Sequence, residues 1–134
     1  MADLDGHADL VLVDAPCTGC GTWRRNPDAK WRLRPGSLEV RGKEQAAVLD
    51  RAVRLVKPGG RIVYVTCSVL PEENDGAVKF LLSADFFALA AENVVAPDRL
   101  PGLMDAIHVT TSGLQMSPRR TGTDGFYVAI LRKQ

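Results

Sequence analysis

The sequence predicts an α/β fold in which strands and helices alternate along the chain and the strands form a parallel sheet. Two short runs rich in β-branched residues, Leu10-Val11-Leu12-Val13 and Arg61-Ile62-Val63-Tyr64-Val65-Thr66-Cys67, have the composition of buried parallel strands. Between them, apolar residues recur at the spacing of a helix. The 134 residues, 46% hydrophobic and 25% charged, fit one folded domain. No apolar run approaches the length of a membrane-spanning helix, so we expect no membrane partner.

The first strand is expected to end at Asp14-Ala15-Pro16, where the chain turns. Residues 17–35 are rich in Gly, Pro, Asn and Arg without periodicity, which predicts a long loop. The first helix is predicted from one apolar face, and Lys57-Pro58-Gly59-Gly60 is expected to end it. That face comprises Ala46, Leu49, Val53 and Val56.

After the second strand, a second helix is expected to begin at Pro71, with Glu72 and Glu73 complementing the helix dipole. Its predicted buried face comprises Ala77, Val78, Leu81 and Leu82. Residues 86–91 are interpreted as a third strand and residues 125–131 as the last one. Residues 94–113 are expected to be irregular.

Reactive side chains follow both predicted strands at their carboxyl ends. Asp14 and Cys17 follow the first strand, and Cys67 ends the second. Ligands and chemistry gather at this edge of parallel sheets, and a thiol becomes a nucleophile as its thiolate. The alternative is that each cysteine is a small buried apolar residue, and the residues alone leave both interpretations open. Three cysteines, an odd number, indicate a reducing compartment, and we expect the cytoplasm.

Cys17-Thr18-Gly19-Cys20 is also a C-x-x-C motif, which raises a dithiol or zinc alternative. The residues that follow it do not start a helix, as a thioredoxin-like motif requires. Cys67, His7 and His108 lack zinc-ligand spacing, so we expect no metal and treat both histidines as surface residues. The sequence contains neither G-x-G-x-x-G nor G-x-x-x-x-G-K-[ST], and therefore no glycine-rich nucleotide cradle.

The formal net charge is only +1, but residues 23–43 form a basic stretch with seven basic and two acidic residues, a local charge of +5. Trp23 and Trp31 lie within it and are the two tryptophans of the sequence. Such a stretch suits phosphate contact with base stacking, or equally a solvated loop anchored by its tryptophans. The basic residues are Arg24, Arg25, Lys30, Arg32, Arg34, Arg41 and Lys43.

Three segments resemble motifs of the NOL1/NOP2/Sun family of RNA cytosine-5 methyltransferases, with its bacterial ribosomal-RNA branch the nearest. Residues 13–22 (VDAPCTGCGT), continued by Arg25-Asn26-Pro27-Asp28 and Lys30-Trp31-Arg32, resemble the family's motif IV. Residues 55–74 are similar to its motif VI region, and residues 122–127 (GTDGFY) to its C-terminal motif. Together the three segments span nearly the whole chain.

The resemblance implies a Rossmann-like methyltransferase that uses S-adenosylmethionine to methylate RNA, with ribosomal RNA the expected class. Cys67 would be the nucleophile that attacks carbon 6 of cytosine, and Cys17 would assist release of the methylated base. Asp14 would hydrogen-bond the base and, with Pro16, contact the cofactor. Cys20 matches no catalytic position. The resemblance also implies RNA contacts for Arg24, Arg25, Lys30 and Arg32.

In this family the catalytic domain begins with strands that carry a glycine-rich cofactor loop, whereas here residues 1–7 lead directly into the motif IV strand. Residues 1–134 are therefore expected to be the C-terminal part of the catalytic domain, a partial sheet without the first cofactor-binding strands. We expect little cofactor affinity from this chain alone, and self-association through an exposed edge at Leu10-Val11-Leu12-Val13. The alternatives are a catalytically inert fragment that at most binds RNA or a partner chain, and a dithiol oxidoreductase.

Overall fold

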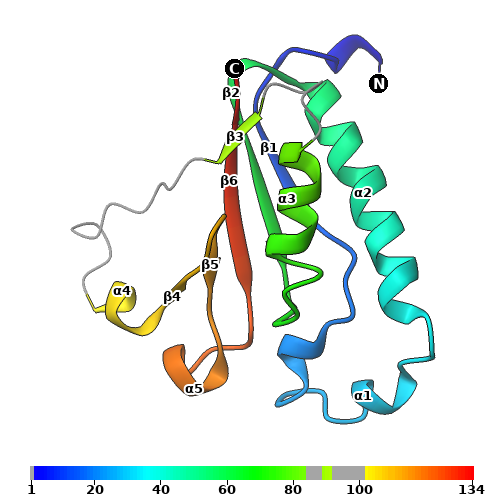
Figure 1. The fold of residues 1–134 in the computed structure, drawn as a ribbon, viewed down its shortest axis with the longest axis vertical. Coiled ribbons are helices and arrows are strands. Elements are labelled where there is room, and N and C mark those ends of the chain that lie inside the picture. Colours follow the sequence, from blue (N-terminus) through cyan, green and yellow to red (C-terminus); the bar gives the residue numbers. More distant parts are fainter. Residues whose placement is uncertain (1, 84–88, 92–101) are drawn as a thin grey trace.

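The computed structural model describes residues 2–83, 89–91 and 102–134, which form one mixed sheet with helices packed on it (Figure 1). The sheet order is β1-β2-β6-β5-β4, with β3 also paired to β6. The strands are β1 (Ala8–Asp14), β2 (Val56–Thr66), β3 (Leu89–Ala91), β4 (His108–Val109), β5 (Leu114–Gln115) and β6 (Tyr127–Lys133). The helices are α1 (Ala29–Arg32), α2 (Ser37–Leu55), α3 (Asp75–Ser83), α4 (Leu103–Ala106) and α5 (Pro118–Thr121), with 3₁₀ turns η1 (Ala2–Leu4) and η2 (Cys20–Thr22).

The strand directions agree only in part with the predicted parallel sheet. β1 and β2 are parallel, and Asp14 pairs with Val65, so their carboxyl ends lie at the same edge. The prediction is wrong for β6, which runs antiparallel to β2, β3 and β5. An apolar sequence pattern indicates that a strand is buried, but it does not indicate whether the strand runs parallel or antiparallel to its neighbours. The sequence therefore did not reveal the direction of β6.

The first predicted helix is present as α2, but its end differs. Val56 is the first residue of β2, and the buried residues of α2 are instead Gln45, Leu49, Ala52 and Val53. Pro58-Gly59-Gly60 belongs to β2, where the register shifts from Ala8–Val56 pairing to Leu10–Arg61 pairing. Residues typical of a helix stop therefore form a bulge, with Gly59 at a φ of 77°.

The second predicted helix, α3, begins at Asp75, four residues later than expected. Residues 71–74 form turns instead, in which the Gly76 amide donates to the Pro71 carbonyl. The predicted buried face of α3 is confirmed, with Val78 and Leu81 buried. Ala77 and Leu82 are partly buried against the core.

The other predicted segments agree in part. Of the expected third strand, residues 89–91 form β3 and residues 86–88 lie outside the described part of the chain. The expected irregular segment also lies partly outside it, and its residues 102–113 include α4 and β4. The last strand begins at Tyr127 rather than at residue 125. The predicted loop over residues 17–35 contains the short turns η2 and α1.

The core lies between the central sheet and the two long helices, α2 and α3, which pack side by side on one face of the sheet (Figure 1). Tyr64 and Tyr127 are fully buried there, with their rings edge to face at a centroid distance of 6.3 Å. β1 is an edge strand on which Leu10 and Leu12 are 58% and 67% exposed, whereas Val11 is half-buried and Val13 is buried. The predicted exposed apolar edge is therefore confirmed for Leu10 and Leu12 only. In the described residues, no helix has the length and apolar character needed to cross a membrane.

Candidate active site

Three segments from distant parts of the chain meet beyond the carboxyl ends of β1 and β2. We call residues 15–28 the Cys17 loop and residues 67–70 the Cys67 turn. The Gly21 amide donates to the Cys67 carbonyl at 3.0 Å, and the Gly125 amide donates to the Gly21 carbonyl at 2.8 Å. A Cβ atom on Gly21 would lie 2.1 Å from the Gly125 carbonyl oxygen, so only glycine permits this approach. The backbone thereby joins all three motif segments.

The two strand-end cysteines are in contact, with 3.4 Å between the Sγ atoms of Cys17 and Cys67. Both side chains are half-buried. The hydrogen bond from Cys17 lowers the pKa of Cys67 to about 7, outweighing the opposite effect of burial. The same hydrogen bond, followed by burial, raises the pKa of Cys17. Cys67 is therefore the thiol that ionises first, and Cys17 remains protonated beside it as the donor.

Cys20, by contrast, is buried and has a structural role. Its Sγ lies 3.2 Å from the Ser68 hydroxyl and accepts a hydrogen bond from the Val69 amide at 3.3 Å. These contacts hold the Cys67 turn against η2. The thiol contact of Cys17 is with Cys67, a geometry that does not favour the C-x-x-C dithiol alternative.

The remaining candidate metal ligands are dispersed. Across the described residues, no three His, Cys, Asp or Glu side chains come together as a metal site. His7 and His108 are exposed, as predicted.

Glu73 is a site residue that the sequence analysis missed. Its side chain is 1% exposed, and its carboxylate accepts hydrogen bonds from the Thr18 amide at 2.7 Å and the Thr18 hydroxyl at 2.6 Å. The Gln45 amide donates to the same carboxylate at 3.3 Å. Glu73 thus ties the Cys17 loop to the segment after the Cys67 turn, and the prediction that it complements the dipole of α3 is wrong. Nothing in the sequence indicates that Glu73 is buried while its neighbour Glu72 is exposed.

The Cys67 turn is fixed from its other side by two side-chain amides, those of the buried Asn74 and the half-buried Gln115. Asn74 Nδ2 donates to the Ser68 carbonyl at 3.0 Å, and Gln115 Nε2 donates to the same carbonyl at 3.2 Å. The Thr66 hydroxyl donates to Asn74 Oδ1 at 2.6 Å. The backbone that carries Cys67 is therefore held at several points.

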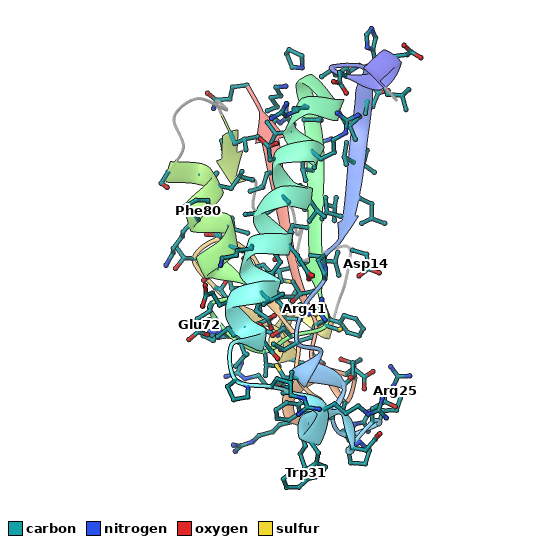
Figure 2. The ribbon with its side chains drawn as sticks, turned by 90° about the vertical axis from the view of Figure 1, so that its right-hand side faces the viewer. Asp14, Arg25, Trp31, Arg41, Glu72 and Phe80 are labelled. Atoms are coloured by element: carbon teal, nitrogen blue, oxygen red, sulfur yellow. The ribbon has the colours of Figure 1, made fainter. Side chains whose placement is uncertain are left out.

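Asp14 lies at the end of β1 with its exposed carboxylate turned away from the helices (Figure 2). Among the described residues it has neither a hydrogen-bond partner nor an ion pair through this carboxylate, which leaves both oxygens available as acceptors. Its negative charge acts to raise the pKa of Cys67. The Pro16 carbonyl already accepts a hydrogen bond from Gln45 at 2.9 Å, so the ring of Pro16 is what remains for other contacts.

The four predicted RNA-contact residues differ in their surroundings. Arg24 and Arg25 lie 3.8 and 2.7 Å from the carboxylate of Asp124, which is 9% exposed. Arg32 pairs with Asp28, whereas Lys30 lies over the Trp31 ring, with Nζ 4.7 Å from its centroid. Three of the four cations thus lie beside a carboxylate of the chain, and Arg24 and Arg25 share the single charge of Asp124.

The two tryptophans of the basic stretch also differ. Trp23 is half-buried, as an anchoring residue would be. Trp31 is 80% exposed and projects from the end of the molecule opposite the termini (Figure 2). Trp23 therefore fits the interpretation of an anchored loop, and Trp31 is the tryptophan that is accessible for base stacking.

The geometry of this site agrees with a comparison against protein families, in which the model described as "16S rRNA methyltransferase RsmB/F" matches residues 2–132. The chain belongs to this family. A relative from Mycobacterium tuberculosis (strain CDC 1551 / Oshkosh), described as "Putative methyltransferase MT1451", is 42% identical over 98% of the chain. The match covers 28% of that relative, so the chain spans about a quarter of its length.

Solved structures of two further proteins share the fold. One, described as "Crystal Structure of PH0851", is 35% identical with a TM-score of 0.83, covering 96% of this chain and 27% of the other. The second is NSun6 from Pyrococcus horikoshii with SFG, 27% identical with a TM-score of 0.68, covering 91% of this chain and 29% of the other. These matches confirm the predicted family and the partial methyltransferase sheet.

Proposed function

We propose that this chain carries the nucleophile-bearing part of an RNA cytosine-5 methyltransferase that acts on ribosomal RNA, with S-adenosylmethionine as methyl donor. The observation that carries the proposal is the Cys17–Cys67 pair. Its Sγ atoms are 3.4 Å apart at the carboxyl ends of two parallel strands, and the pKa of Cys67 is lowered to about 7. A general scaffold for packing has no need of an ionised thiol beside a protonated one.

In the attack step, the Cys67 thiolate forms a bond to carbon 6 of cytosine, and the electron pair of the carbon 5–carbon 6 double bond moves toward carbon 5. Carbon 5 is then nucleophilic, and S-adenosylmethionine, when bound, would supply the electrophilic methyl group and leave as S-adenosylhomocysteine. The free carboxylate of Asp14 is available to accept a hydrogen bond from the amino group of the base. That hydrogen bond would strengthen as the ring becomes electron-rich.

Release requires loss of the proton from carbon 5 and cleavage of the bond between Cys67 and carbon 6. The pKa of Cys17 is raised first by its hydrogen bond to Cys67, and the Cys67 charge adds to this effect. Both effects disappear once the Cys67 sulfur is covalently bound and uncharged. The Cys17 thiol then ionises more easily, which suits it to accept the proton during release.

The residues present fit one side of a cofactor site. Asp14 offers an unpaired carboxylate at the end of β1, and Pro16 offers its ring, while the chain has no glycine-rich cradle. The related NSun6 structure contains SFG, an S-adenosylmethionine analogue. We therefore infer that the 134 residues alone bind S-adenosylmethionine weakly. Isothermal titration calorimetry that gave tight binding would overturn this inference.

A second candidate is a catalytically inert chain that binds RNA or another chain, and the exposed β1 edge favours it. Edge strands with unpaired backbone groups pair with other strands, so β1 is expected to mediate self-association. Sedimentation velocity should show dimers that Leu12→Lys disperses. A wild-type chain that sediments as a monomer at high concentration would contradict the self-association.

We retain the cytoplasm as the expected compartment.

Activity separates the two candidates. We would graft residues 2–132 into a full-length relative in place of the matching segment, and measure transfer of a tritiated methyl group to small-subunit RNA. Methylation that disappears with Cys67→Ala but survives Cys20→Ala supports the methyltransferase. A properly folded chimera without activity favours the inert chain.

A further inference from the structure

The seven cations of the basic stretch at residues 23–43 fall into two classes. Five are paired with carboxylates: Arg24 and Arg25 with Asp124, Arg32 with Asp28, Arg41 with Glu44, and Lys43 with Glu39. Within the described part of the chain, Lys30 and Arg34 have no such partner. Arg24 and Arg25 share one carboxylate, so an anion that approaches this surface meets uncompensated charge there and at Lys30 and Arg34.

Arg34 differs from Lys30 because it lines a cleft of about 490 Å³, which we call the Arg34 cleft. Cys17 and Thr18 line the same cleft, so it leads to the cysteine pair. The volume falls within the usual range of ligand pockets, roughly 300–1,000 Å³. Lys30 is not part of the cleft lining, and its ammonium group lies over the Trp31 ring.

The backbone at Arg34 is held in place although its side chain is exposed. The Arg34 amide donates to the Ser37 hydroxyl at 2.9 Å, and the Ser37 amide donates to the Arg34 carbonyl at 3.0 Å. Gly36, with a φ of 83°, completes the turn that enters α2. Of the other cations in the cleft, Arg32 and Arg41 are already paired, so Arg34 is the guanidinium left for a ligand.

We propose that Arg34 binds a backbone phosphate of the RNA strand next to the target cytidine, within the Arg34 cleft. This inference rests on the proposed function, because it assumes that a cytidine reaches the cysteine pair. A planar guanidinium donates two parallel hydrogen bonds to a phosphate, which makes arginine the suitable side chain. A strand held in this way would place a neighbouring base beside Cys17 and Cys67.

The test measures binding of a fluorescein-labelled, single-stranded 12-nucleotide RNA to the 134-residue chain by anisotropy at several KCl concentrations. Arg34→Gln should weaken binding roughly three- to tenfold and make the slope of log K against log[KCl] shallower by about 0.7. Arg34→Lys should keep most of the slope, since it keeps the charge. Arg119→Gln is the matched control, because Arg119 is an exposed arginine of α5 outside the cleft.

Equal salt slopes for wild type and Arg34→Gln would overturn the proposal, as would a loss no larger than that of Arg119→Gln. So would a wild-type chain that does not bind the RNA, or binds a polyglutamate peptide equally well. Disulfide-exchange kinetics of Cys67 should be unchanged by Arg34→Gln, and a change would also count against a role limited to phosphate binding. Loss of methylation by Cys67→Ala in the chimera tests the proposed function separately.

Discussion

Replacing Cys17 with alanine should raise the pKa of Cys67. The Cys17 thiol donates to Cys67 across 3.4 Å, and this hydrogen bond is the main cause that lowers the Cys67 pKa from 9.0 to about 7. Burial and the charge of Asp14 both act to raise the pKa of Cys67. Without the hydrogen bond that counteracts them, this pKa should return to about 9. Cys17→Ser is the matched control, because a serine hydroxyl also donates a hydrogen bond to a thiolate.

The size of the effect follows from the thiolate fraction. At pH 7 about half of Cys67 is thiolate with a pKa of about 7, against about 1% with a pKa of 9.0. The more basic thiolate is intrinsically about eightfold more reactive in disulfide exchange, given a Brønsted slope near 0.45. The rate at pH 7 should therefore fall roughly sixfold in the alanine variant. Above about pH 8 the order should reverse, with the variant faster because its more basic thiolate is then sufficiently populated.

The assay is stopped-flow reaction with 4,4′-dithiodipyridine from pH 5 to pH 10, with the modified cysteine identified by mass spectrometry. Circular dichroism establishes that each variant is folded. An inflection near pH 7 that persists in Cys17→Ala would refute the assignment of Cys17 as the donor. A serine variant that behaves like the alanine variant would show that sulfur, rather than a hydrogen-bond donor, is what Cys67 requires.

Three further substitutions test how the site is held. Glu73→Gln should lower the free energy of urea unfolding by about 2 kcal/mol, because it places an amide against the donors of Thr18, whereas Glu72→Gln at the exposed neighbour should not. Gly21→Ala should lower Tm by several degrees through its clash with the Gly125 carbonyl. Gly42→Ala in α2, where a Cβ meets open space, should raise Tm or leave it unchanged. Burial acts to raise the pKa of Asp75, but the hydrogen bonds from Tyr127, Thr110 and the Ser112 and Thr111 amides together outweigh it and lower the pKa. The contribution of Asp75 to stability is therefore present above about pH 4 and lost as the pH falls through the lowered value. Asp75→Asn should flatten this acid limb of the unfolding free energy, and an unchanged limb would contradict the role of Asp75.

The sequence predicted part of the site from two things: the local apolar pattern of two strands, and the rule that ligands bind at the carboxyl ends of parallel strands. β1 and β2 read as buried parallel strands, and the carboxyl ends of neighbouring parallel strands meet, which brings Asp14, Cys17 and Cys67 together. The catalytic roles came from the resemblance to the family and not from the pattern. They remain predictions until the variants are measured.

What the sequence did not reveal depends on contacts between distant segments. Arg25 and Asp124 lie 99 residues apart in the chain, and no local signal indicates that they pair. The burial of Glu73 depends on the position of Thr18, 55 residues earlier. Pro58-Gly59-Gly60 shows a different limit, because the same residues suit a helix stop and a bulge, and pairing of β2 with β1 decides between them.

Covalent trapping tests the central claim most directly, since only a nucleophile at carbon 6 becomes bonded to the base. The chimera that carries residues 2–132 is incubated with S-adenosylmethionine and small-subunit RNA containing 5-fluorocytidine, whose fluorine blocks the loss of a proton from carbon 5. We predict a protein–RNA complex stable to denaturing electrophoresis, attached at Cys67, absent in Cys67→Ala and retained in Cys20→Ala. A complex that still forms in Cys67→Ala, or that maps to Cys17, would contradict the assignment of Cys67 as the nucleophile.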